Sequence, residues 1–243
     1  MKNVLSPRLI HFANRVARIP FAKLLLKPFY YPYKRFLEDK RRRAFHACGL
    51  HLLSDFDQVF SERKLPYTLA FGTLLGAIRE HGFISHDCDI DVFVWNEDYS
   101  PEIKGALENK GFTLEHAFLV DGGRLGREET YSKYDVSVDI FYVYPPIDEY
   151  QYTCDFIPYS DEVSWAHSQK KYGRVLARRI EIPVSKQSMQ VSFGSLLLPV
   201  PDNYDEFLRF RYGDDYMIPN PSWSNGENPH IVVWNDAIAT YSE

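Results

Sequence analysis

Apolar residues recur every three or four positions in two stretches near the start of the chain, which is the spacing of one face of an α-helix. The first stretch ends before Pro20 and consists of Leu5, Leu9, Phe12, Val16 and Ile19. The second predicts a helix over about 40–63, which ends before Pro66, and consists of Phe45, Cys48, Leu52, Phe56 and Val59. Two amphipathic helices are therefore expected ahead of the rest of the chain.

Strand and helix patterns follow one another after Pro66. Helices are expected from Gly72 to about Arg79, over Glu102–Lys110 and over Asp202–Tyr212. Strands are expected at 67–71, Ile90–Trp95, 112–119, 131–144 and Val191–Leu198, and the chain after Pro219 reads as loop. Strand alternation over 136–142 puts Asp139 with Ser137 and Phe141, opposite Val136, Val138, Ile140 and Tyr142. The predicted fold is α+β, with a mixed β-sheet flanked by helices.

Composition narrows the class of protein. The 243 residues are 45% apolar, 25% charged and 16% aromatic, with only three Met, so a folded domain with a ring-rich core is expected and disorder is excluded. The longest uncharged stretches, Leu65–Ile78 and Gln187–Pro201, are shorter than the roughly 20 apolar residues of a spanning helix. The three Cys lie far apart and the start of the chain has no secretory pattern. These features favour a cytoplasmic protein without a structural zinc site.

Charge divides the chain into two parts. Residues 1–45 carry twelve Lys or Arg and two acidic residues, a net charge of +10. Since the whole chain has a net charge of −5, the remainder has a net charge of −15. An acidic body argues against nucleic-acid binding. A basic amphipathic arm over 1–40 is typical of a peripheral anchor on an anionic membrane surface, here the inner face of the membrane. The alternative is that its apolar stripe packs on the body, residues 41–243.

Acidic residues gather at the start of the Ile90–Trp95 strand. Side chains two positions apart on a strand point to the same side, so Asp89 and Asp91 present two carboxylates together. Asp87 lies two positions before Asp89 and would point to the same side. The two carboxylates of such a pair repel each other unless a cation lies between them. Without a cation, Asp139 would be a charged carboxylate buried on a face of the sheet. Oxygen ligands of this kind suit Mg²⁺ or Mn²⁺. Solvated turn acids are the alternative for 87–91, but they do not explain Asp139.

A strand–glycine–helix turn precedes this cluster. Gly72 allows close approach to the backbone, and Thr73 opens a helix whose N-terminus favours anions, which suits a phosphate. A plain helix-capping turn has the same appearance, and Arg79 has the ordinary position of a helix-end arginine.

The run Gly72-Thr-Leu-Leu-Gly-Ala-Ile-Arg79, then Gly82-Phe-Ile84 and Asp87-Cys-Asp-Ile-Asp91, closely resembles the LicD/fukutin-type family. The resemblance continues in Val138-Asp-Ile-Phe141 and Tyr212-Gly-Asp-Asp-Tyr-Met217. It implies a polymerase β-like nucleotidyltransferase fold. The chain departs from the family pattern at His86, where Trp is usual, and at Cys88, which replaces an Asp.

The resemblance also implies an activity. A phospho-alcohol, phosphocholine first and a polyol phosphate second, would pass from a CDP-linked donor (CDP-choline or a CDP-polyol) to a sugar hydroxyl of a cell-surface glycan, with release of CMP. Asp89, Asp91 and Asp139 would hold the metal, and Gly72, Thr73 and Arg79 would bind phosphate. Asp139 or Asp87 would accept the hydroxyl proton. The alternatives are a nucleotidyltransferase that releases pyrophosphate from an NTP, and a catalytically silent membrane-associated scaffold.

Overall fold

The computed structural model describes residues 20–147, 149–160, 162, 164–220 and 228–243. The chain divides into two compact units, 1–43 and 44–243, and their boundary lies inside the first described helix, α2 (Pro20–Glu62). The helix predicted over 40–63 is therefore confirmed, although it begins much earlier, at Pro20. The apolar stripe predicted before Pro20 lies outside the described residues.

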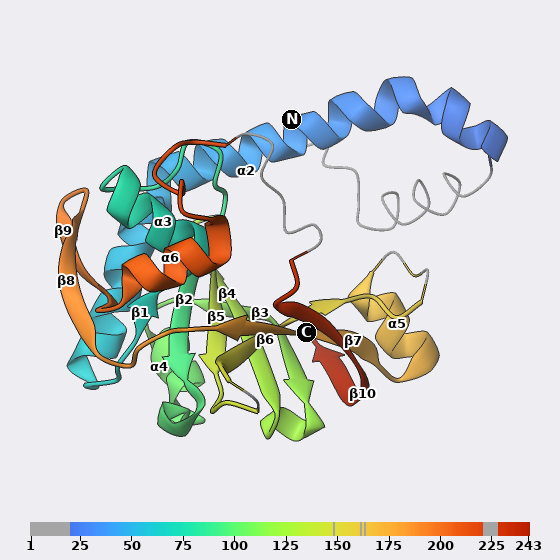
Figure 1. The fold of residues 1–243 in the computed structure, drawn as a ribbon. Helices are drawn as coiled ribbons and strands as arrows, with labels where there is room; N and C mark the ends of the chain where they lie inside the picture. Colours follow the sequence, from blue (N-terminus) through green and yellow to red (C-terminus); the bar gives the residue numbers. More distant parts are fainter. Residues whose placement is uncertain (1–19, 148, 161, 163, 221–227) are drawn as a thin grey trace. The chain divides into compact units, whose positions relative to one another are not determined.

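One strongly curled sheet of eight strands forms the body (Figure 1), in the order β1-β2-β5-β4-β3-β10-β7-β6. Its strands are β1 (Thr68–Leu69), β2 (Ile90–Trp95), β3 (Thr113–Val120), β4 (Gly126–Lys133), β5 (Val136–Val143), β6 (Gln151–Ile157), β7 (Val175–Ile182) and β10 (Ile231–Ser242). Among the strands that the structure describes, β2 and β5 pair in parallel and the other pairs are antiparallel. A bridge between Tyr144 and Tyr152 brings β6 back to the end of β5.

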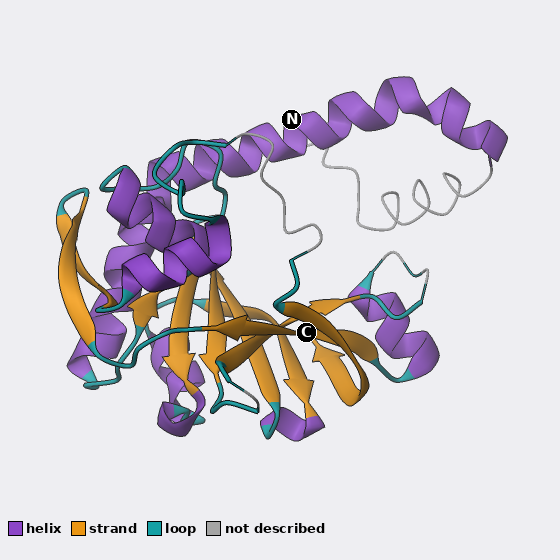
Figure 2. Cartoon of the chain, in the orientation of Figure 1, coloured by secondary structure: helices purple, strands orange, loops and turns teal. Residues whose placement is uncertain are grey.

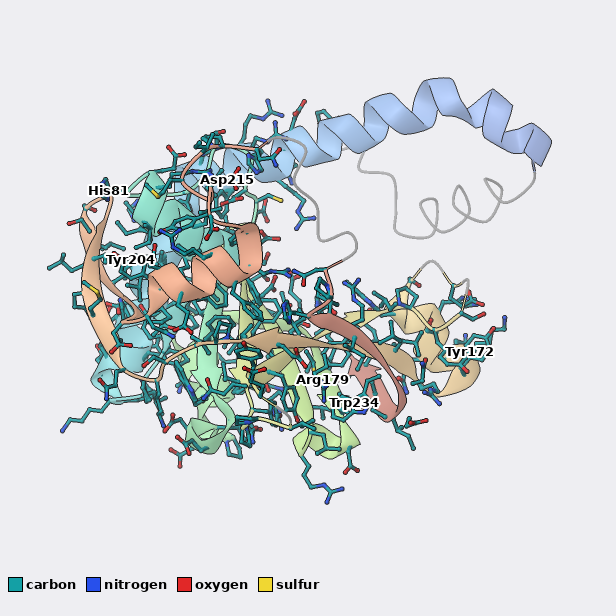
Figure 3. The ribbon with its side chains drawn as sticks, in the orientation of Figure 1. His81, Tyr172, Arg179, Tyr204, Asp215 and Trp234 are labelled. Atoms are coloured by element: carbon teal, nitrogen blue, oxygen red, sulfur yellow. The ribbon has the colours of Figure 1, made fainter. Side chains whose placement is uncertain are left out.

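Helices cover the sheet (Figure 2) and a separate two-stranded hairpin lies beside it. The helices are α3 (Phe71–Arg79), α4 (Glu102–Asn109), α5 (Trp165–Tyr172) and α6 (Tyr204–Tyr212), with 3₁₀ turns η1 (Asn96–Asp98) and η2 (Asp121–Gly123). The hairpin consists of β8 (Ser188–Phe193) and β9 (Leu196–Pro201). Its tip lies near His81, labelled in Figure 3, and the Gly194 N–H donates a 2.7 Å hydrogen bond to the His81 carbonyl. The predicted α+β fold with a mixed sheet is confirmed.

Aromatic rings fill the core, as the composition predicts. Phe71 packs against three other rings, with centroid distances of 5.1 Å to Phe93, 5.0 Å to Phe141 and 6.0 Å to Phe207. Because Phe71 begins α3 while the other rings lie on β2, β5 and α6, this cluster joins both helices to the sheet. Each buried ring contributes about 1.5–3 kcal/mol to the free energy of unfolding.

The prediction of a single strand over 131–144 is wrong. The structure has a hairpin there, with β4 and β5 joined by Tyr134 and Asp135, both left-handed at φ 60° and 61°. A two-residue turn with positive φ at both positions matches the twist of antiparallel strands. Gly and Asn are the usual residues of such a turn, so Tyr-Asp gave no turn signal in the sequence.

The later part of the chain also differs from prediction. The strand expected at Val191–Leu198 is a hairpin that turns at Gly194, which has φ 57°. The segment after Pro219, expected to be loop, contains β10, which pairs with β7 and then with β3 across an irregularity between Trp234 and Ala239. Its exposure pattern does not alternate regularly, so pairing with distant strands forms it rather than a local apolar pattern.

Candidate active site

Asp91 and Asp139 lie side by side on the two parallel strands of the sheet. Asp91 is the second residue of β2 and is in register with Asp139 of β5. Aligned residues on neighbouring strands project from the same face, so the structure brings together these two predicted site residues. Phe141, two positions after Asp139, belongs to the aromatic cluster around Phe71. The carboxylates therefore lie where the cluster holds α3 and α6 against the sheet.

Asp87 and Asp89 complete the acidic group from the loop before β2. Burial, together with the negative charges of Asp89, Asp139 and Asp87, raises the pKa of Asp91 well above its ordinary value. Burial also raises the pKa of Asp87 to about 6, with His86 opposing the shift and Asp89 adding to it. The structure thus brings together all four predicted acids, and burial followed by mutual repulsion favours the protonated forms of Asp87 and Asp91.

Gly72 and Thr73 both contact Asp91. The Gly72 N–H donates a hydrogen bond to the Asp91 carboxylate, and the Thr73 Oγ1 accepts one of 2.9 Å from the Asp91 N–H. Thr73 is buried, and this hydrogen bond connects the start of α3 to β2. Both residues therefore orient Asp91, and their contact with a phosphate stays a prediction.

Two unusual backbone requirements shape α3, one at its first residue and one in its middle. Phe71 is left-handed, at φ 37°, a conformation that costs a bulky residue energy and is held here by its ring contacts. A Cβ on Gly76 would lie 2.4 Å from the Gly82 carbonyl oxygen, so only glycine fits there. The second glycine of the predicted motif therefore serves packing.

Arg79 ends α3 beside the acidic group. Its Nε donates to the Glu80 carboxylate at 2.9 Å and its Nη1 to the Tyr216 carbonyl at 3.5 Å. Its side chain is only 10% exposed, and its positive charge opposes part of the rise that burial causes in the pKa of Asp87. The predicted arginine thus lies close enough to the acids to offset their charge.

Sequence reasoning missed several polar residues that the fold adds to this group. Burial raises the pKa of Glu128 well above its ordinary value, and Asp139, Asp155 and Asp91 raise it further. By contrast, its neighbour Glu129 projects from the opposite face and is paired with Arg127 at 2.9 Å. A strand that presents acids on both faces gives no apolar alternation, so no signal in the sequence separates Glu128 from Glu129.

Two arginines interact with acidic side chains on or near this face of the sheet. Arg211 of α6 is buried, with its guanidinium 5.4 Å from the centre of the Phe71 ring, and it interacts electrostatically with Asp91 and Asp155. Arg178 of β7 donates a 2.8 Å hydrogen bond from Nε to Asp155. Arginine side chains therefore lie near the carboxylates of the site. Arginines bind phosphate and carboxylates bind cations, so the pair suits a ligand that carries both.

The donor set fits a hard divalent cation. Asp87 Oδ2 is buried and has no hydrogen-bond partner among the described residues. A Cβ on Gly72 would lie 3.7 Å from both Asp87 Oδ1 and Asp91 Oδ2, so glycine leaves the space between these carboxylates open. Among the residues that the structure describes, no group of three or more His, Cys, Asp or Glu side chains is arranged so that it could hold a metal ion. The oxygens suit Mg²⁺ or Mn²⁺, and the metal site stays a proposal.

Comparison with known proteins identifies the family. A family model described as LicD/FKTN/FKRP, nucleotidyltransferase domain, matches residues 64–203, more than half of the chain. Ribitol-5-phosphate transferase FKTN of Homo sapiens is 23% identical over 247 residues, which cover 96% of this chain and 49% of that protein. Lipopolysaccharide cholinephosphotransferase LicD of Haemophilus influenzae is 44% identical over 50 residues, 21% of this chain and 19% of that protein.

The chain spans about half the length of the FKTN proteins that it matches. The range matched by the family model contains Gly72, Thr73, Arg79 and the four acids Asp87, Asp89, Asp91 and Asp139. The resemblance drawn from the motifs is therefore confirmed, and this chain belongs to the LicD/FKTN/FKRP family.

Proposed function

We propose that this protein transfers a phospho-alcohol from a CDP-linked donor to a sugar hydroxyl of a glycan and releases CMP. One observation carries the proposal: Asp91 and Asp139 are in register on adjacent parallel strands, with Asp87, Asp89 and the open space at Gly72 beside them. Family membership supports the same chemistry, because relatives bear the names of a ribitol-5-phosphate transferase and a cholinephosphotransferase.

In the proposed reaction, the sugar oxygen attacks the phosphorus next to the alcohol. A new oxygen–phosphorus bond forms, the bond to the CMP oxygen breaks, and the hydroxyl proton passes to Asp139 or Asp87. Asp89, Asp91 and Asp139 would hold Mg²⁺ or Mn²⁺, which supplies positive charge for the phosphate oxygens when bound. Arg79 and Arg211 would add positive charge for the donor, and Gly72 and Thr73 hold Asp91 in place.

The donor is tested by thermal stabilisation and by product analysis. CDP-choline, CDP-ribitol, CDP-glycerol and CTP are each added with Mg²⁺, and a bound donor is expected to raise the melting temperature because it binds only the folded state. We expect CDP-choline to stabilise most and to yield CMP when a glycan acceptor is present; CDP-ribitol in its place would make the transferred group a polyol phosphate.

The same assay separates the alternatives. Release of pyrophosphate from CTP, without CMP from any CDP-alcohol, would indicate a nucleotidyltransferase and contradict the proposal. Absence of both stabilisation and products with every nucleotide would favour the catalytically silent scaffold.

We further propose that the basic arm holds the protein at the inner face of the membrane. None of the described helices combines the length and apolar character needed to cross a membrane. Deleting residues 1–36 leaves the compact unit 44–243 whole, so the truncated protein is expected to stay folded and to keep turnover of a water-soluble donor and acceptor. Binding to vesicles with anionic lipid should fall sharply, and binding of the full chain should weaken as salt rises.

Sedimentation with anionic and with neutral vesicles measures this effect. Equal binding by the full chain and the truncated protein would contradict the membrane role. An unfolded truncated protein would instead show that the arm packs on the body.

A further inference from the structure

Four polar side chains form a row across four neighbouring strands. Asp91 of β2 is in register with Asp139 of β5, Asp139 with Thr130 of β4, and Thr130 with His116 of β3. In-register residues share a face of the sheet, so the row runs along one face from the acidic group on β2 and β5 to His116 on β3. Neither Thr130 nor His116 belongs to the motifs that identify the family here.

An irregularity in β3 places His116 in this row. The register between β3 and β4 shifts between Leu114 and His116, so Glu115 is passed over in the pairing. Irregularities of this kind change which face a side chain occupies and are common beside active sites. Without it, the residue opposite Thr130 would not be His116.

Hydrogen bonds connect the last three members of the row. The Thr130 Oγ1 donates to Asp139 Oδ1 at 2.6 Å, and the His116 Nε2 lies 3.0 Å from the same Thr130 oxygen. A hydroxyl has one proton. When Asp139 is ionised, it accepts that proton, so the Thr130 oxygen accepts from His116 and His116 carries its proton on Nε2.

Aromatic rings hold His116 in position. Its ring lies 5.2 Å from Phe118, 5.5 Å from Trp165 and 5.9 Å from Tyr241, centroid to centroid. Burial lowers the pKa of His116, against the opposing charges of Glu115 and Glu243, which favours the neutral ring. A packed, neutral imidazole is a directional donor.

We infer that Thr130 and His116 are positioning residues, which fix the rotation of the Asp139 carboxylate by holding its Oδ1. The inference rests on the proposed function for the role of Asp139 in transfer. Without these two side chains the donor would still bind, but the Asp139 carboxylate would no longer be oriented correctly for the reacting hydroxyl and the cation. Partners of this kind typically change activity or metal affinity by about 10- to 100-fold.

Two pairs of variants test this role. Thr130→Val and His116→Leu remove the hydroxyl and the N–H donor, whereas Thr130→Ser and His116→Gln keep a hydroxyl and an N–H. Thr153→Val is the matched control, because Thr153 is a buried strand threonine whose hydroxyl has no partner among the described residues. We expect kcat to fall about 10- to 100-fold in the first two variants, with the donor KM little changed and most of kcat restored in the conservative pair.

Two readouts are independent of turnover. Nitrogen-15 spectra of the histidine ring should show His116 protonated on Nε2 in the wild type, with a shifted Nε2 signal in Thr130→Val. Calorimetry should show weaker Mn²⁺ binding by Thr130→Val than by Thr153→Val. If the wild type transfers no phospho-alcohol, the proposed function fails while these two readouts still test the row.

An Nδ1-protonated His116 would overturn the inference, as would Thr130→Val behaving like Thr153→Val in both kcat and Mn²⁺ affinity. A loss of kcat that Thr130→Ser does not restore would show a packing role instead. If Thr130→Val does not fold, His116→Leu and His116→Gln provide the same comparison.

Discussion

Asparagine in place of Asp91 is expected to reduce turnover by several orders of magnitude and at the same time to stabilise the fold. Asp91→Asn keeps the shape of the side chain and an oxygen that can accept from the Gly72 N–H, but removes the charge that the proposed cation requires. It also removes the repulsion from Asp89, Asp139 and Asp87. Activity and stability should therefore change in opposite directions, which is typical of a functional carboxylate.

The stability gain should depend on pH. Because the folded-state pKa of Asp91 is raised, the folded protein binds this proton more tightly than the unfolded chain, and wild-type stability falls as pH rises from about 4 through the folded-state pKa. Asp91→Asn lacks this loss, so its advantage in melting temperature should be larger at pH 8 than at pH 5. Asp202→Asn, which changes an exposed acid outside the site, is the matched control.

Calorimetric melts at both pH values, together with turnover in saturating Mg²⁺, measure the two effects. Wild-type turnover in Asp91→Asn would remove Asp91 from the site. A variant less stable than the wild type at pH 8 would show that repulsion within the acidic group is not relieved.

Removal of divalent cations is expected to stop transfer completely, and Mg²⁺ or Mn²⁺ should restore it. Metal binding should also release protons near pH 6, because the pKa of Asp87 is about 6 and that of Asp91 is raised, whereas a cation favours the ionised carboxylates. Repeating the titration in buffers with different ionisation enthalpies gives the number of protons released. Asp139→Ala should weaken metal binding and reduce turnover while the fold stays intact.

Two outcomes would contradict this account of the metal. Full activity after treatment with EDTA would exclude a required cation. Unchanged metal affinity and turnover in Asp139→Ala would leave Asp139 outside the site, although it lies in register with Asp91.

The part of the site that was predictable is local in the chain. The motif from Gly72 to Asp91 contains the turn, the helix and the loop acids, and strand alternation alone gave the correct face for Asp139. Both kinds of signal depend on residues a few positions apart. The register of β2 with β5 then brought the two strand acids together, in agreement with the resemblance.

The rest of the site depends on contacts between distant strands. Glu128, Thr130 and His116 reach the acidic group because β4 turns back on β5 at Tyr134 and because β3 carries an irregularity beside His116. Neither feature leaves a usual sequence signal, since no glycine marks the turn. The same applies to β10, which is a strand only because β7 and β3 pair with it.

The fate of the donor's two phosphates tests the central claim most directly. A CDP-alcohol labelled at the phosphate next to the alcohol is incubated with the protein, Mg²⁺ and a glycan acceptor. The proposed reaction predicts that the label moves to the glycan while an equal amount of unlabelled CMP is released, and that Asp91→Asn does neither. A label that stays with the nucleotide, or pyrophosphate released from CTP in place of CMP, would contradict phospho-alcohol transfer at this site.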